Sequence, residues 1–254
     1  MDPNLIRVAL SSFRKSGVKV LVIGGQACVL YGAAQFSRDL DLALTPDFET
    51  LDKLGEALAD LQAELIAVPP LDPAILERGH AVHYRCKRED LEDLRIDVMS
   101  RMRGVDDFDQ LWERRFVVNA PEGPINLISI PDLVKAKKTQ RSKDWPMIER
   151  LVEVTYFSKT IPRTDSLVDF WLQELRTPDL LLRVALDYPD KTLAHADRRP
   201  VLRAAIAGNR DEIDRLLAEE QRIETNLDRA YWAPLKKELE ALRAAKRIDR
   251  NSPS

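Results

Sequence analysis

The sequence predicts an α+β fold, in which a mixed sheet with flanking helices is followed by an all-helical C-terminal region. Two observations predict it. Short apolar or alternating runs, typical of strands, recur through the first half of the chain, at 19–23, 39–44, 81–86, 94–99, 116–119 and 125–128. Apolar residues at helical spacing separate some of these runs and dominate the chain after about residue 129.

The first elements each have a local reason. A helix over 4–15 ends at Gly17, because glycine readily takes the left-handed conformation that follows many helices. Thr45 or Asp47 can cap a helix over 48–61. Residues 63–78 contain three prolines and are expected to form a loop with a short turn.

The later elements follow from turn and cap residues. The charged segment 87–93 joins the strands 81–86 and 94–99 as an antiparallel pair, and a Pro- and Gly-containing turn joins 116–119 to 125–128. Ser129 begins a helix, and another is expected over 144–157. After a linker at 158–166, helices are expected at 167–176, 179–186, 200–207, 211–224 and 227–247. We therefore expect two domains, 1–160 and 161–254.

Composition excludes some classes of protein. The 254-residue chain is 44% hydrophobic and carries a formal net charge of −3, which does not suit a uniformly basic nucleic-acid-binding protein. Basic residues gather locally, with five Lys or Arg in 135–143. The two cysteines, Cys28 and Cys86, lie in apolar or strand-like segments and favour reduced thiols in the cytoplasm. No apolar run approaches the roughly 20 residues of a membrane span, so we expect no membrane partner.

Two acids on one strand are the first candidate site. Asp39 and Asp41 stand two residues apart and therefore share a face of the strand 39–44, together with Ser37 just before it. Paired carboxylates repel each other unless a cation neutralises them, and Mg²⁺ prefers oxygen ligands that it shares with substrate phosphates. The alternative is an edge strand with solvated acids.

A glycine pair precedes these acids. Gly24 and Gly25 follow an apolar strand and open a helix, where backbone amides can approach a phosphate closely. The turn lacks both the dinucleotide-binding glycine spacing and a P-loop lysine. On its own it could be a plain tight turn.

Together, Gly24-Gly25, thirteen intervening residues and Asp39-Leu40-Asp41 resemble the signature of the nucleotidyltransferase superfamily, with its polymerase-beta-like fold. Residues 36–42 are most similar to the nucleotidyltransferase toxins of type IV toxin–antitoxin, or abortive-infection, systems. The resemblance covers about residues 18–158 and implies a nucleotidyltransferase-like sheet.

The resemblance implies further site residues. A third carboxylate on a later strand corresponds to Asp97, although an ion pair with a neighbouring strand is an alternative. A basic helix corresponds to Lys135 and Lys138, which would contact a triphosphate or simply form the solvated side of the helix. Asp144 matches a downstream acid, but its position before Trp145-Pro146 favours a helix cap.

The expected activity is that of a Mg²⁺- or Mn²⁺-dependent nucleotidyltransferase that moves an NMP from an NTP to an acceptor hydroxyl. Asp39, Asp41 and Asp97 would bind two metal ions, and Asp97 would also accept the proton of the acceptor. The acceptor stays open between tRNA, a protein and a small molecule, and a cognate antitoxin is a further partner to test. The alternatives are a nucleotide-binding or antitoxin-binding component with little turnover, and an antibiotic-type small-molecule transferase.

Overall fold

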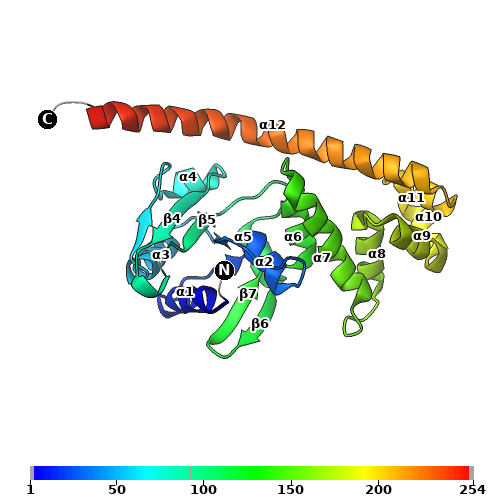
Figure 1. Cartoon of the computed structure of the whole chain (residues 1–254), viewed down its shortest axis with the longest axis horizontal. Helices are drawn as coiled ribbons and strands as arrows, with labels where there is room; N and C mark the ends of the chain where they lie inside the picture. The colour runs from blue at the N-terminus through cyan, green and yellow to red at the C-terminus, as the bar shows by residue number, and fades with distance from the viewer. Residues whose placement is uncertain (1–2, 92, 252–254) are drawn as a thin grey trace. The chain divides into compact units, whose positions relative to one another are not determined.

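The computed structural model describes residues 3–91 and 93–251 and has the α+β fold that the sequence predicts (Figure 1). Its strands, as described, form one mixed sheet with the order β3-β4-β5-β2-β1-β7-β6. They are β1 (Leu21–Val22), β2 (Asp39–Ala43), β3 (Ala63–Leu65), β4 (Val82–Cys86), β5 (Arg95–Met99), β6 (Phe116–Ala120) and β7 (Gly123–Leu127).

Helices alternate with the strands in the first half of the chain and make up most of the second half (Figure 1). They are α1 (Pro3–Lys15), α2 (Gly24–Leu30), α3 (Phe48–Asp60), α4 (Pro73–Glu77), α5 (Phe108–Glu113), α6 (Ile130–Lys137), α7 (Trp145–Phe157), α8 (Asp165–Glu174), α9 (Pro178–Asp187), α10 (Pro189–His195), α11 (Val201–Ile206) and α12 (Arg210–Asn251). Short 3-10 turns lie at η1 (Glu89–Leu91) and η2 (Ser142–Asp144). No helix in the described part of the chain is long and apolar enough to cross a membrane.

Internal contacts divide the chain into two compact units. The first unit runs to Leu30 and includes Ala34–Ala136 and the residues from Ala230 onward, so it holds the whole sheet. The second unit consists of Tyr31–Ala33 and Lys137–Arg229 and is helical. The predicted boundary between 160 and 161 falls in the loop between α7 and α8, inside this second unit, and the two-domain division stays a prediction. The outer ends of the predicted domains, 1–2 and 252–254, lie outside the described residues.

The sheet separates an apolar face from a polar one. Leu40 and Leu42 of β2 and Ile96 and Val98 of β5 are completely buried, and these strands pair in parallel. Because side chains alternate along a strand, the residues between these apolar ones lie on the opposite face. The hydrophobic pattern therefore fixes the face on which the acids of β2 are found.

The prediction of a loop over 63–78 was wrong, and the local sequence explains why. This segment contains the edge strand β3, which pairs with β4, and the short helix α4. Asp72 caps α4 by accepting from the Ala74 amide at 2.9 Å, and Pro73 occupies the first turn. The Asp-Pro pair is a helix-start signal that the neighbouring prolines obscured.

The C-terminal helices differ from the prediction in two respects. The expected separate helices at 211–224 and 227–247 form the single helix α12, which contains Pro234. Thr225 and Asn226, which separate the two predicted helices, are weak helix formers, yet α12 includes both. The helices α5 and α10 were not predicted.

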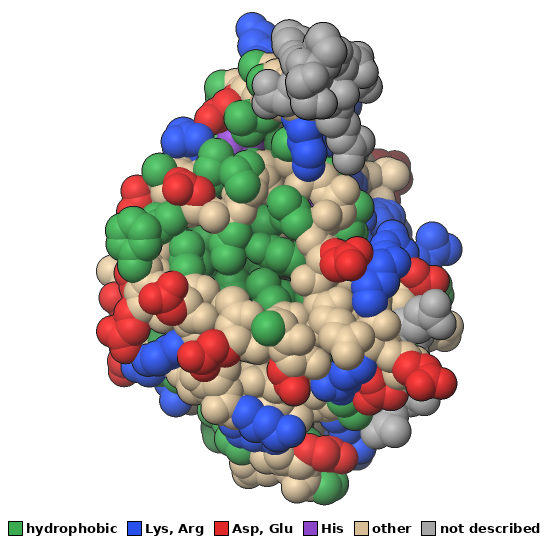
Figure 2. Space-filling view, turned by 90° about the vertical axis from the view of Figure 1, so that its left-hand side faces the viewer, with side chains coloured by type: hydrophobic (Ala, Val, Ile, Leu, Met, Phe, Trp, Pro, Cys, Tyr) green, Lys and Arg blue, Asp and Glu red, His purple; other side chains and the backbone are tan. Residues whose placement is uncertain are grey.

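One face of the molecule has a mixed surface. Figure 2 shows a patch of hydrophobic side chains ringed by interspersed acidic and basic ones. Large hydrophobic side chains exposed in the first unit include Phe48, Leu65 and Ile66. The face in this view is therefore not a uniformly basic surface for nucleic acid.

Candidate functional site

The candidate acids meet at the centre of the sheet. β2 and β5 pair in parallel with Asp41 directly opposite Asp97 and Asp39 directly opposite Arg95. Residues that face each other across a ladder, and residues two apart on one strand, share a face. The register therefore places Asp39, Asp41 and Asp97 on the same face.

Asp97 already has two partners. Arg95 donates to both of its carboxylate oxygens, at 2.7 and 2.9 Å, and Nδ1 of His83 lies 2.8 Å from Oδ1. Burial raises the pKa of Asp97, but the contacts with His83 and Arg95 outweigh burial, so its pKa lies below the ordinary value. The carboxylate is therefore held in its ionised form.

His83 is a residue of this site that the sequence did not indicate. It stands opposite Asp97 across the antiparallel β4–β5 ladder. No other candidate site residue lies near His83 in the sequence, and only the strand register brings it to Asp97. Asp97 forms an ion pair with Arg95 within β5, and its contact across the ladder is with the imidazole ring of His83.

The glycine turn packs directly on Asp41. The Gly25 amide donates to Oδ2 of Asp41 at 3.1 Å. Gly24 has φ +61°, and a Cβ at this position would lie 1.9 Å from the same oxygen. Only glycine can hold this backbone and leave room for the carboxylate. The sequence predicts that the Gly25 amide contacts a phosphate, but in this structure the amide donates to Asp41. Its contact with a nucleotide stays a prediction.

Ser37 joins the same cluster. Its hydroxyl donates to the backbone carbonyl of Asp39 at 3.0 Å, and a Cβ at Gly25 would lie 2.7 Å from its Oγ. The turn, Ser37 and the two acids of β2 therefore form one connected group, although they are spread over residues 24–41.

The charge of the cluster is negative. The hydrogen bonds to Asp97 raise the pKa of Arg95 most, and the charges of Asp39 and Asp41 raise it further. One guanidinium thus faces three carboxylates. Within the described residues, the Asp39 carboxylate makes no hydrogen bond or ion pair. This surplus of negative charge suits a cation.

The residues of the cluster have the chemistry to bind a Mg²⁺ ion whose other ligands come from substrate phosphates. Among the described residues, no group of three or more His, Cys, Asp and Glu is placed to hold a metal ion by itself. Mg²⁺ is commonly bound by one or two carboxylates together with substrate phosphates, so such a group is not required. The pair Asp39 and Asp41 has the right donor chemistry, and Asp97 would have to release a contact with Arg95 or His83.

The two predicted lysines lie in different units. Lys135 belongs to the first unit, and its ammonium lies 3.9 Å from Asp132, an acid that also accepts from Arg114. Lys138 belongs to the second unit, where Nζ donates to Glu174 at 2.8 Å. Contact of either lysine with a triphosphate stays a prediction.

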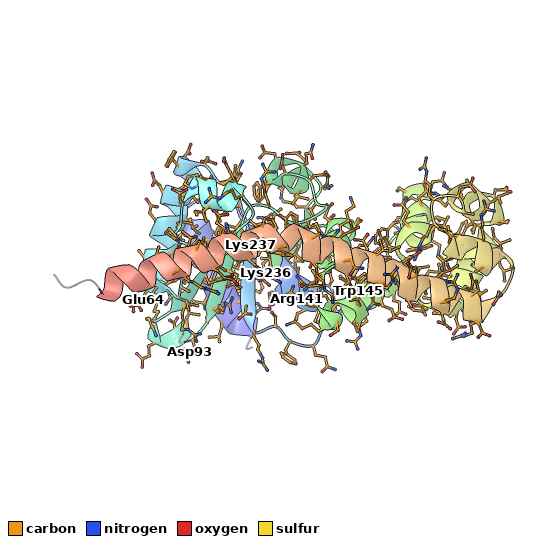
Figure 3. All side chains as sticks on the ribbon, turned by 90° about the horizontal axis from the view of Figure 1, so that it is seen from above. Glu64, Asp93, Arg141, Trp145, Lys236 and Lys237 are labelled. Carbon is orange, nitrogen blue, oxygen red and sulfur yellow. The ribbon has the colours of Figure 1, made fainter. Side chains whose placement is uncertain are left out.

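Asp144 occupies the N-cap position of α7, as the sequence predicted, but its side chain accepts no hydrogen bond from the first turn of this helix. Its carboxylate accepts instead from Lys137 Nζ at 3.1 Å, Thr139 Oγ1 at 2.6 Å and Arg141 Nε at 2.8 Å. Arg141, three residues before this acid, and Trp145, directly after it, are labelled in Figure 3. The Asp144 and Lys137 side chains are almost completely buried and form an internal ion pair.

Replacing Gly24 with alanine is expected to lower the free energy of unfolding by at least about 1–2 kcal/mol, the cost of a left-handed backbone for an L-residue, with a further loss from displacing Asp41. The control is Gly55→Ala in α3, where a Cβ meets no atom within 4 Å. Urea unfolding measures both variants. A Gly24→Ala protein as stable as Gly55→Ala would contradict the packing of the turn on Asp41.

Asp144→Asn is expected to lower the free energy of unfolding by about 3–5 kcal/mol at pH 7, because it leaves the buried Lys137 without its counter-charge. Burial raises the pKa of Asp144, but Lys137 and the neighbouring donors lower it below the ordinary value. The stabilisation is therefore present above the unfolded-state pKa and is lost as the pH falls below about 4.

Urea unfolding at pH 7, 5 and 3.5 compares wild type with Asp144→Asn. The difference in stability should shrink at the lowest pH, whereas Asp187→Asn, at an exposed acid of α9, should match wild type throughout. A difference that stays constant with pH would refute the ion-pair account.

Comparison with known proteins adds no identification. The chain matches no protein-family model, no curated protein and no solved structure. The resemblance to nucleotidyltransferases therefore stays a prediction from the motifs, and the function has to be argued from the residues of the site.

Proposed function

We propose that the chain is a nucleotidyltransferase that moves an NMP from an NTP to an acceptor hydroxyl. The observation that supports this most is the register of β2 and β5, which sets Asp41 opposite Asp97 with Asp39 on the same face. A glycine turn that opens a helix packs on Asp41. Carboxylates on rigid strands beside such a turn are an arrangement suited to a metal-bound triphosphate.

In this proposal Asp39 and Asp41 hold Mg²⁺ or Mn²⁺ together with the phosphates of the NTP. The bound ion would neutralise the charge that develops on the phosphate oxygens. Gly25 and the first turn of α2 would lie beside the triphosphate, and Ser37 would add a hydroxyl at the edge of the same cluster.

The reaction forms one bond and breaks one. The acceptor oxygen attacks the α-phosphorus, the bond from that phosphorus to the β-phosphate oxygen breaks, and pyrophosphate leaves. The proton of the acceptor hydroxyl passes to solvent water. Because the pKa of Asp97 is lowered, it is a weak proton acceptor at neutral pH and is better suited to stay ionised as a ligand than to act as general base.

The setting of the reaction follows from the resemblance. A toxin or defence role would pair the chain with a cognate antitoxin, and the acceptor would be tRNA, a protein or a small molecule. Among the described residues Cys28 and Cys86 are buried and form no disulfide, which favours the cytoplasm.

One observation favours a second candidate function. Arg95 and His83 already occupy the Asp97 carboxylate, which is what a nucleotide-binding or antitoxin-binding component with little turnover would have. The experiments below separate this candidate from the enzyme.

Replacing Asp39 and Asp41 together by Asn is expected to abolish metal-dependent NTP binding. An Asn at 41 still offers an oxygen to the Gly25 amide, so the fold should survive. Calorimetric titration with each NTP, in Mg²⁺, in Mn²⁺ and in EDTA, measures the loss. The control is Asp52→Asn with Glu56→Gln, two exposed acids of α3 that carry the same charge change. Unchanged affinity in a folded Asp39/Asp41 variant would refute the metal site.

Asp97→Asn is expected to leave NTP affinity within about threefold of wild type and to slow transfer by roughly a hundredfold or more, the scale of losing one charged group in an active site. Transfer from α-labelled NTPs to RNA, protein and small-molecule pools provides the readout. Asp93→Asn, at an exposed acid before β5, is the control. If Asp97→Asn transfers label as fast as wild type, Asp97 has only a structural role. A wild-type protein that binds NTP but transfers nothing would favour the binding component.

A further inference from the structure

The second unit contains a pocket that the proposed reaction does not use. It has a volume of about 490 Å³ and is lined by residues of α8, α10 and α12 and of the segments that follow α6, α8 and α10. We call it the α8–α12 pocket. Its lining includes Lys138, Glu174, Arg176, Arg198, Arg199 and Glu220. Pockets of this size commonly hold small molecules.

Two arginines at this pocket share one carboxylate. Arg199 donates to the two oxygens of Glu220 at 3.0 and 3.1 Å, and Arg176 donates to Oε2 of the same residue at 3.2 Å. Both arginine side chains are about nine-tenths buried, at 10% and 11% exposed. Because each guanidinium is positive and Glu220 carries one negative charge, this trio has a surplus of positive charge.

The guanidinium groups are held in place by the backbone. Arg199 donates to the carbonyls of Leu172 and Leu175 at 2.9 and 2.7 Å, and Arg176 donates to the carbonyl of Leu217. The Arg176 guanidinium also lies over the ring of Trp145, 4.8 Å from its centroid; Trp145 is labelled in Figure 3. The two guanidinium groups are therefore held in a fixed position, which lowers the entropic cost of binding an anion.

The rest of the lining does not cancel this charge. Lys138 and Glu174 form a pair of their own. Arg198 is exposed, and within the described residues its side chain makes no hydrogen bond or ion pair. Not counting His195, the pocket is lined by four basic residues and three acids, Glu174, Glu220 and Glu224. Burial lowers the pKa of Arg176, and the nearby charge of Arg199 lowers it further, against the opposing effect of Glu220.

We propose that the α8–α12 pocket binds a small molecule through a phosphate group. A phosphate dianion would offset the surplus positive charge and accept hydrogen bonds from guanidinium groups, which match its geometry. The exposed Arg198, which also lines the pocket, would donate to the same group. The proposal is independent of the metal site and does not require transferase activity.

Calorimetry and thermal unfolding of the full chain in EDTA test this with three probes: inorganic phosphate, glycerol 3-phosphate and acetate. EDTA removes any contribution from metal-bound phosphate at the acids of β2. Inorganic phosphate or the phosphate ester should bind and raise Tm, and acetate should not. Tighter binding of the ester would identify an organic phosphate, and equal binding would identify phosphate itself. Absence of binding by both phosphates up to roughly 10 mM, or equal binding of acetate, would overturn the proposal.

Glu220→Gln provides the sharper test. Gln keeps an acceptor for the arginines but removes the competing negative charge, so phosphate should bind about tenfold more tightly, equivalent to roughly 1.4 kcal/mol. If Glu220 only holds the helices together, phosphate affinity would be unchanged or weaker, and that result in a folded variant would overturn the proposal.

Arg198→Ala supplies a test that does not disturb the buried trio. It should weaken phosphate binding about tenfold, while Arg183→Ala, at an exposed arginine of α9 outside the pocket, should bind like wild type. This pair decides the matter if Glu220→Gln fails to fold. Equal affinity of the two arginine variants would refute the role of the pocket.

Discussion

The parallel pairing of β2 with β5 is the constraint on which the candidate site depends. It sets Asp41 opposite Asp97, and the antiparallel pairing of β5 with β4 adds His83 to the same row. A slip of one residue in β5 would turn Asp97 to the apolar face and bring Ile96 out of the core. The buried apolar residues of these strands therefore hold the polar ones in register, and packing on one face specifies chemistry on the other.

The close packing of the acids has consequences for the turn beside them. Like charges repel, and the protein offsets part of this with Arg95, which contacts Asp97 and interacts with the charges of Asp39 and Asp41. The Gly25 amide adds a further donor to Asp41, which requires the chain at Gly24 to adopt a positive φ. The glycine pair is thus explained in this structure by the carboxylate it touches, and a bound cation would relieve the repulsion that remains.

Two carboxylates of the helical unit are each shared by two cations. Lys137 and Arg141 both contact Asp144, and Arg176 and Arg199 both contact Glu220. The side chain of Arg141 is 58% exposed, so water screens its charge, whereas Arg176 and Arg199 are both about nine-tenths buried. The cluster around Glu220 also lines a cavity, and for these two reasons it supports a binding proposal.

The sequence by itself determined much of the local structure. Alternating apolar residues set β2, β4 and β5, the spacing of Asp39 and Asp41 put them on one face, and Gly24-Gly25 marked the turn, because each depends on neighbours within a few residues. Only the tertiary structure decided the partners. His83 reaches Asp97 through strand register. The Asp144 side chain bonds Lys137 and not the amides of α7. Arg176 and Arg199 meet Glu220, which lies 44 residues after Arg176 in the chain. Such contacts depend on how whole elements pack, which no local pattern encodes.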